Sequence, residues 1–141
     1  MKQLLIGFVA LIAILFGIFN IVSTEEEPIR IHNEQLSKTF ISQKVPIIDI
    51  RTKDEWKRTG IVEDSILMTF YEPDGRFNEE SFLRNLNSKF DKKSEFAILC
   101  RSGNRSNRVT RFLVSKGYQN VINLVGGIKQ GIKNGVQFKH L

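Results

Sequence analysis

The run FAILCRSGNRSNRV, residues 96–109, decides which fold the rest of the chain is expected to adopt. Its first residues, 96–99, are apolar and predict a short buried strand. Its last residues open an amphipathic segment, 106–116, which predicts a helix. Cys100 stands between the two, at the carboxyl end of the strand, and open α/β sheets form their binding sites at that edge. Cys100 is therefore the first candidate for a functional residue.

The remaining sequence alternates short apolar runs with helical periodicity, which is typical of an α/β domain with a largely parallel sheet. Thr52 and Glu55 have the spacing of a capping box at the start of one helix. Asp49 and Arg51 follow a predicted strand, so we expect them at the same sheet edge as Cys100. The predicted strands are residues 29–31, 46–50, 65–70, 96–99 and 121–124, and the predicted helices are residues 33–42, 52–58, 81–90, 106–116 and a short helix after Gly127.

Composition and charge narrow the class of protein. The chain is 41% hydrophobic and 26% charged, which is typical of a folded domain, and its net charge is +6. Nucleic-acid binding is disfavoured, because the sequence has neither a long basic run nor basic residues interleaved with aromatic ones. Cys100 is the only cysteine, so neither an intramolecular disulfide nor a cysteine-rich zinc site can form. His32 and His140 have no ligand-like spacing, and we expect neither a metal nor a cofactor.

Residues 4–22, LLIGFVALIAILFGIFNIV, form an uncharged hydrophobic segment. As a helix, these 19 residues would span about 28 Å, close to a bilayer core of about 30 Å. Lys2 precedes the segment and three glutamates, 25–27, follow it, so the positive-inside rule places the domain on the extracytoplasmic, periplasmic side.

This segment divides the chain into residues 1–24 as a transmembrane anchor or signal segment, 25–28 as a linker and 29–141 as the domain. We favour a retained anchor over a signal segment whose cleavage would release the domain to the periplasm, because the apolar run is long and no small-residue cleavage site follows it. A buried core helix is disfavoured, since soluble helices are seldom so uniformly apolar.

The loop after Cys100 has the composition of an anion cradle. The candidate binding loop comprises Arg101, Ser102, Gly103, Asn104, Arg105 and Ser106. Its backbone N–H groups and the positive dipole end of the following helix favour an anion, and therefore a thiolate nucleophile at Cys100. Gly103 permits a backbone conformation that leaves room above the sulfur. The alternative is a buried structural cysteine, which the combination of strand end, glycine, arginines and helix disfavours.

Three motifs in this order and spacing resemble the rhodanese family of sulfurtransferases. They are IIDIRTKDEWKRTG at 47–60, CRSGNRS at 100–106 and GYQNVINLVGG at 117–127. The resemblance implies a five-stranded parallel sheet with helices on both faces, here preceded by the hydrophobic N-terminal helix. It also implies that the Cys100 thiolate takes sulfur from a small anionic donor, such as thiosulfate or a polysulfide, and passes it from a persulfide to a thiol or another nucleophile.

The same resemblance assigns roles to neighbouring residues. Backbone amides from Arg101 to Arg105 would stabilise the persulfide and the bound anion. The Arg105 side chain would bind the oxyanion of the donor. Asp49 and Arg51 would organise the adjacent loop and support the site rather than take part in catalysis.

Two positions depart from the family pattern, and two other functions stay open. Ile61 stands where a histidine is common, and Gly131 where a tryptophan is common, which leaves the donor and the turnover rate open. Cysteine-dependent phosphatases and arsenate reductases use a similar loop. Their loop has five residues between the cysteine and the arginine, whereas four separate Cys100 from Arg105, and the smaller cradle suits sulfur better. A noncatalytic module that carries sulfur or binds a partner would need no different residues.

Overall fold

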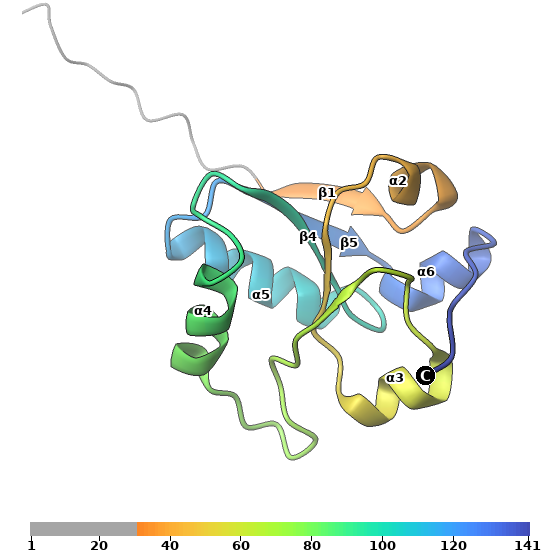
Figure 1. Cartoon of the computed structure of the whole chain (residues 1–141), viewed down its shortest axis with the longest axis horizontal. Coiled ribbons are helices and arrows are strands. Elements are labelled where there is room, and N and C mark those ends of the chain that lie inside the picture. Colours follow the sequence, from red (N-terminus) through yellow and green to blue (C-terminus); the bar gives the residue numbers. More distant parts are fainter. Residues whose placement is uncertain (1–30) are drawn as a thin grey trace, which may run out of the picture.

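Five parallel strands form the centre of the computed structural model, which describes residues 31–141 (Figure 1). Their order across the sheet is β1-β5-β4-β2-β3, and every neighbouring pair runs parallel. All strands therefore end at the same edge. The elements in chain order are β1 (His32–Gln35), α2 (Lys38–Ser42), β2 (Ile47–Asp49), α3 (Lys53–Thr59), β3 (Ile66–Leu67), α4 (Glu79–Asn87), β4 (Glu95–Leu99), α5 (Asn104–Ser115), β5 (Asn120–Val125) and α6 (Gly127–Lys133).

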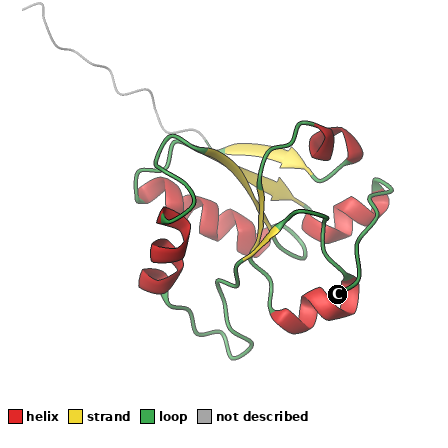
Figure 2. Cartoon of the chain, in the orientation of Figure 1, coloured by secondary structure: helices red, strands yellow, loops and turns green. Residues whose placement is uncertain are grey.

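Helices cover both faces of the sheet, so the central strands are buried on both sides (Figure 2). On one face, Leu86 of α4 and Val109 of α5 belong to the same apolar cluster as Ile98 of β4. On the other face, Phe40 of α2 and Ile128 of α6 belong to a second cluster, which also holds the β4 and β5 residues of that side. Burial on both faces explains why β4 reads as a continuous apolar run. The architecture predicted from the sequence, a five-stranded parallel sheet between helices, is confirmed.

The first strand lies where the sequence predicted the start of a helix. β1 occupies His32–Gln35 and pairs with β5, with Asn33 opposite Asn123. Its side chains are all exposed, so no apolar period marks it, and the backbone pairing with β5 decides the structure instead. The predicted helix over 33–42 is therefore wrong in its first half. α2 begins at Lys38, and the Ser37 hydroxyl caps it by accepting a hydrogen bond from the Phe40 N–H at 3.1 Å.

Other boundaries shift by a few residues. The capping box at the start of α3 is confirmed, since the side chains of Thr52 and Glu55 each accept a hydrogen bond from the other's backbone N–H. β3 is shorter than the predicted strand over 65–70, although the Phe70 N–H still donates to the Ile50 carbonyl at 3.2 Å. α4 begins earlier than predicted, because Asn78 caps it by accepting from the Ser81 N–H. Local capping side chains thus move the helix ends.

The hydrophobic segment 4–22 lies outside the residues that the structure describes. The same holds for the expected N-terminal helix, for the linker over 25–28, and for residues 29 and 30 of the strand predicted over 29–31. Within residues 31–141, no helix is both long and apolar enough to cross a membrane.

The two positions that depart from the family pattern are both packed into the fold. Ile61 is buried and forms an antiparallel bridge with Lys139, with backbone N–H to carbonyl distances of 2.9 and 2.8 Å. Gly131 lies in α6 against the side chains of Leu36 and Phe138. A Cβ atom at residue 131 would lie 2.6 Å from Leu36 Cδ2 and 3.1 Å from Phe138 Cζ. Leu36 therefore fills the space that a larger residue at this position would need.

Gly131→Ala tests this packing. Alanine normally stabilises a helix interior by about 1 kcal/mol relative to glycine, but overpacking a filled core costs about 1–3 kcal/mol. We expect a net loss of unfolding free energy, measured by urea denaturation. Lys133→Ala, an exposed change in the same helix, should stay within about 0.5 kcal/mol of the unchanged chain. A Gly131→Ala chain that is as stable as the unchanged one would contradict the packing argument.

Candidate active site

The carboxyl end of β4 carries the cysteine that the sequence singled out. Cys100 is fully buried. The Gly103 N–H donates a hydrogen bond to its Sγ at 3.1 Å, and the Ser106 N–H donates another at 3.3 Å. α5 begins at Asn104, inside this loop, so its positive dipole end lies beside the sulfur. The arrangement stabilises negative charge on Sγ, which a nucleophilic sulfur needs.

Two glycines allow the cysteine loop to lie directly against the start of α6. Gly103 has a φ of +89°, and a Cβ there would lie 2.6 Å from the Gly126 N atom. A Cβ on Gly127 would lie 2.2 Å from the Cys100 carbonyl oxygen. The resulting contact is backbone on backbone. The Ile128 N–H donates to the Cys100 carbonyl at 2.9 Å, and the Lys129 N–H donates to the Arg101 carbonyl at 3.1 Å.

The predicted loop residues separate into two groups. Gly103 and Ser106 are buried at the sulfur, whereas Arg101, Ser102 and Asn104 are exposed. Arg105 is partly buried and turns to a partner outside the loop. The backbone amides of Gly103 and Ser106 are thus the ones in contact with Sγ.

A chain of hydrogen-bonded polar side chains runs from the sulfur to β1, and the sequence analysis named only its first member, Ser106. Ser106 Oγ lies 3.4 Å from Cys100 Sγ and 2.7 Å from Asn123 Oδ1. Asn123 Nδ2 in turn donates to Asn33 Oδ1 at 3.0 Å. The available signal was one amide side chain inside the otherwise apolar run of β5, which is unusual for a strand with both faces covered.

Asp49 and Arg51 form a buried ion pair at the end of β2, the strand next to β4. Both side chains are almost fully covered, and Arg51 Nη2 lies 2.7 Å from Asp49 Oδ2. The same nitrogen donates to the Gly60 carbonyl at 2.8 Å, and Nη1 donates to Thr59 Oγ1. The pair therefore ties β2 to the end of α3. Within residues 31–141, none of its hydrogen bonds reaches Cys100.

Glu55 joins α3 to the cysteine loop, and sequence reasoning gave it only a capping role. Its two carboxylate oxygens accept hydrogen bonds from both terminal nitrogens of Arg105, at 2.8 and 2.6 Å. Burial by itself would raise the pKa of Glu55, but the hydrogen bonds from Arg105 and Thr52 and the charge of Arg105 outweigh it and lower the pKa to about 2. The hydrogen bond to Glu55 raises the pKa of Arg105. Glu55 and Arg105 are 50 residues apart in sequence, so no local sequence pattern predicts that they pair.

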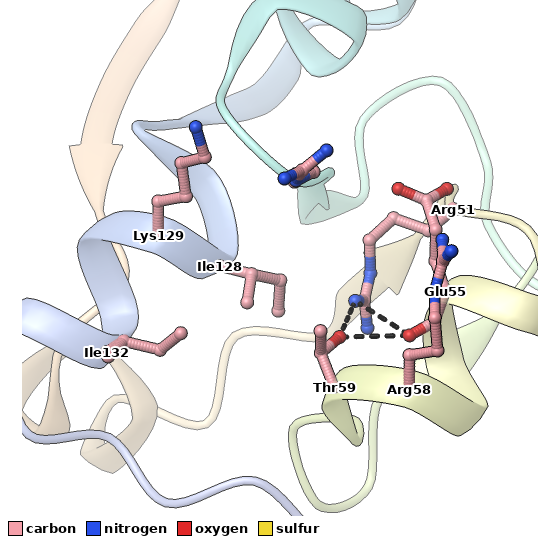
Figure 3. Close-up of a pocket in the computed structure, with 8 residues that line it drawn as sticks. Arg51, Glu55, Arg58, Thr59, Ile128, Lys129 and Ile132 are labelled. Atoms are coloured by element: carbon pink, nitrogen blue, oxygen red, sulfur yellow. Dashed lines mark hydrogen bonds between the residues drawn. The ribbon is translucent and has the colours of Figure 1, made fainter.

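Two hollows flank the exposed part of the loop. The first is a cavity of about 380 Å³ between α3 and α6 (Figure 3). Its lining consists of Arg51, Glu55, Arg58, Thr59, Arg101, Ile128, Lys129 and Ile132. The second is a more polar groove, whose lining includes Arg101, Arg105 and Arg108 together with the carboxylates of Asp54 and Glu72. Arg101, the residue after the cysteine, borders both.

Solved structures share this fold. A rhodanese-like domain protein from Staphylococcus aureus superimposes with a TM-score of 0.56 at 24% identity, over 77% of this chain and 99% of that one. The polysulfide-sulfur transferase homodimer from Wolinella succinogenes superimposes with a TM-score of 0.56 at 17% identity, over 79% of this chain and 80% of that one. At these identities the likeness concerns the fold alone.

Similarity of sequence shows the family as well as the fold. Thiosulfate sulfurtransferase 18 of Arabidopsis thaliana is 31% identical over 108 residues, which cover 74% of this chain and 79% of that protein. The family model of the rhodanese-like domain matches residues 32–134, which is nearly all of the described structure. The match includes β2 and β4, the two strands that bring Asp49 and Cys100 to the same edge of the sheet. The chain therefore belongs to the rhodanese-like domain family, with Cys100 in the loop that follows the central strand.

Proposed function

We propose that the chain is a sulfurtransferase that carries sulfur as a persulfide on Cys100. The observation that carries this proposal is the pair of backbone N–H donors, from Gly103 and Ser106, directed at the sulfur of the only cysteine in the sequence. Two such donors and a helix N-terminus stabilise a thiolate, and after transfer they stabilise an anionic persulfide in the same place.

The loading step conserves atoms and charge. The Cys100 thiolate attacks the outer sulfur of thiosulfate, a new bond forms between Sγ and that sulfur, and the original bond to the sulfonate breaks. Sulfite leaves with the electron pair, and a polysulfide would react in the same way with a shorter polysulfide as the leaving group. In discharge, an acceptor thiolate attacks the outer sulfur and Cys100 leaves as a thiolate. The relative named thiosulfate sulfurtransferase, at 31% identity, supports this class of donor.

The polar groove beside the loop suits an anionic donor. Four arginines line it, Arg58, Arg101, Arg105 and Arg108, together with the carboxylates Asp54, Glu55 and Glu72, so the lining is positive by one charge. Because Glu55 occupies both terminal nitrogens of Arg105, the positive charge available to a donor comes from Arg58, Arg101 and Arg108, and Arg105 contributes as half of an ion pair. Its main effect on the reaction is then to hold the loop in the shape that directs the amides at the sulfur.

A second candidate function has its own observation. Cys100 is 0% exposed, so a donor reaches Sγ only when the loop opens. That burial favours a noncatalytic module that binds a partner through the exposed arginines. A phosphatase is less well supported, because Arg105 is engaged by Glu55 and only four residues separate Cys100 from Arg105.

The persulfide is the direct test. The full-length chain, in mild detergent, is incubated with thiosulfate or a polysulfide, and its intact mass is measured. We expect a gain of one sulfur atom that a later thiol treatment removes, and no gain in Cys100→Ser. No gain with any donor, together with hydrolysis of an aryl phosphate, would establish the phosphatase instead. A chain that gains no sulfur and hydrolyses nothing would be the binding module.

The Glu55–Arg105 pair predicts how stability depends on pH. The pKa of Glu55 is lowered in the folded chain to about 2 from 4.5, so its contribution is complete above pH 4.5 and is lost as the pH falls toward 2. When the pH falls from about 6 to about 3.5, the unchanged chain loses part of this contribution, whereas Glu55→Gln has no carboxylate to protonate at this position. We therefore expect the unfolding free energy of Glu55→Gln to fall by about 1–2 kcal/mol less than that of the unchanged chain. Urea denaturation at both pH values measures this difference. Glu63→Gln, which changes an exposed carboxylate, should follow the unchanged chain, and equal behaviour of both variants would contradict the assignment.

We also propose that residues 4–22 hold the domain at the outer face of a membrane, which rests on their hydropathy and flanking charges. The chain should sediment with membranes, and protease added to spheroplasts should digest the domain. A variant without residues 4–22 should be found in the soluble fraction inside the cell. A mature N-terminus near Ser23 or Thr24 would show that the segment is cleaved.

A further inference from the structure

We propose that the cavity between α3 and α6 is the site of the sulfur acceptor, and that it selects a small thiol carrying an anionic group on an apolar body. This inference rests on the sulfur transfer proposed above, and it adds where the acceptor binds and what chemistry it has. The discharge step needs such a site, because the acceptor must bring its thiolate to the outer sulfur of the persulfide.

The cavity is built onto the cysteine loop. Arg101, the residue after Cys100, lines it directly. Its opposite wall is α6, which the loop holds in place through the hydrogen bonds of Ile128 to the Cys100 carbonyl and of Lys129 to the Arg101 carbonyl. A ligand in this cavity therefore lies beside the loop that carries the sulfur. Its volume, about 380 Å³, is within the range of small-molecule sites.

One wall of the cavity is apolar. Figure 3 shows Ile128 and Ile132 projecting from α6 into the gap that separates α6 from Thr59 on α3. Ile128 is buried, but the side chain of Ile132 is 59% exposed, which is high for an isoleucine in a helix that packs on a sheet. An aliphatic or aromatic body against this wall would remove apolar surface from water, which is favourable.

The charges of the cavity do not cancel. Two of its charged residues are already paired, since Arg51 binds Asp49 and Glu55 binds Arg105. The others are the cations Arg58, Arg101 and Lys129, and no ion pair among residues 31–141 compensates them. A cavity with an apolar wall and three uncompensated cations favours an amphipathic anion over a neutral or cationic ligand.

The transfer step needs no reactant beyond the bound thiol and one proton from water. The anionic persulfide takes up that proton on its outer sulfur, the thiolate of the bound acceptor attacks this sulfur, and a new sulfur–sulfur bond forms. The bond between that sulfur and Sγ breaks, and its electron pair stays on Cys100, which again becomes the thiolate that Gly103 and Ser106 stabilise. The proton leaves with the acceptor persulfide.

The test separates discharge from loading. The full-length chain is loaded with sulfur from a polysulfide, freed of the donor, and mixed with one thiol at a time, and the loss of the extra sulfur is followed by intact mass. The thiols are mercaptohexanoate, its neutral counterpart mercaptohexanol, and the shorter anion mercaptopropionate, with rates expressed per thiolate. We expect mercaptohexanoate to discharge the persulfide about fivefold faster than either of the others, since mercaptohexanol lacks the charge contact and mercaptopropionate lacks the methylene groups that would cover the apolar wall.

Matched variants locate the site. Lys129→Gln and Arg58→Gln should each reduce the preference for mercaptohexanoate over mercaptohexanol about threefold or more, and Ile132→Ser should reduce the preference over mercaptopropionate. Lys133→Gln and Lys57→Gln remove the same charge from exposed positions on the same two helices, outside the cavity lining, and should leave both preferences unchanged.

Three outcomes would overturn the inference. Equal discharge by the three thiols would show that the cavity does not select the acceptor. If Lys133→Gln reduced the preference for mercaptohexanoate as much as Lys129→Gln does, the preference would come from the overall positive charge of the protein and not from binding in the cavity. If the chain takes up no sulfur at all, the proposed function fails and the acceptor site fails with it, whereas loading followed by unselective discharge contradicts only the acceptor site.

Discussion

The Cys100 loop and the first turn of α6 touch through their backbones, and the site depends on this contact. The Cys100 carbonyl accepts the Ile128 N–H at 2.9 Å, and side chains at Gly103 or Gly127 would collide with the backbone opposite. Because no side chain lies between the two segments, the loop closes tightly enough to bring two amides to one sulfur atom. The same contact places α6, with its apolar wall, beside the loop.

Two ion pairs fix the position of α3 next to the cysteine loop. Asp49 and Arg51 tie the end of β2 to the end of α3, and Glu55 ties the start of α3 to Arg105 of the loop. Asp49–Arg51 is fully buried, and such a pair contributes little net stability, because desolvation offsets the attraction, but breaking it leaves a costly unpaired charge. The consequence of the two pairs is geometric: α3 is held at a set position relative to the cysteine loop, which keeps the cavity between α3 and α6 open.

The cysteine loop has a buried part, which holds the sulfur, and an exposed part, which carries Arg101. Sγ is covered and is in contact with backbone donors, while Arg101 is exposed at the border of the cavity and the groove. A sulfur atom held in this way is protected from adventitious oxidants, and the charged surface around it attracts anions. The cavity is partly apolar and the groove is more polar, which suits two ligands of different chemistry.

The sequence by itself determined the strand, loop and helix around Cys100, the capping box of Thr52 and Glu55, and the parallel α/β sheet, because these depend on apolar periodicity and on residues a few positions apart. Only the tertiary structure decided that Glu55 binds Arg105, that Asn123 lies behind the sulfur, and that His32–Gln35 is a strand rather than a helix. Each of these depends on a partner far away in the chain, and an exposed edge strand or a lone polar residue carries no local period by which that partner can be recognised.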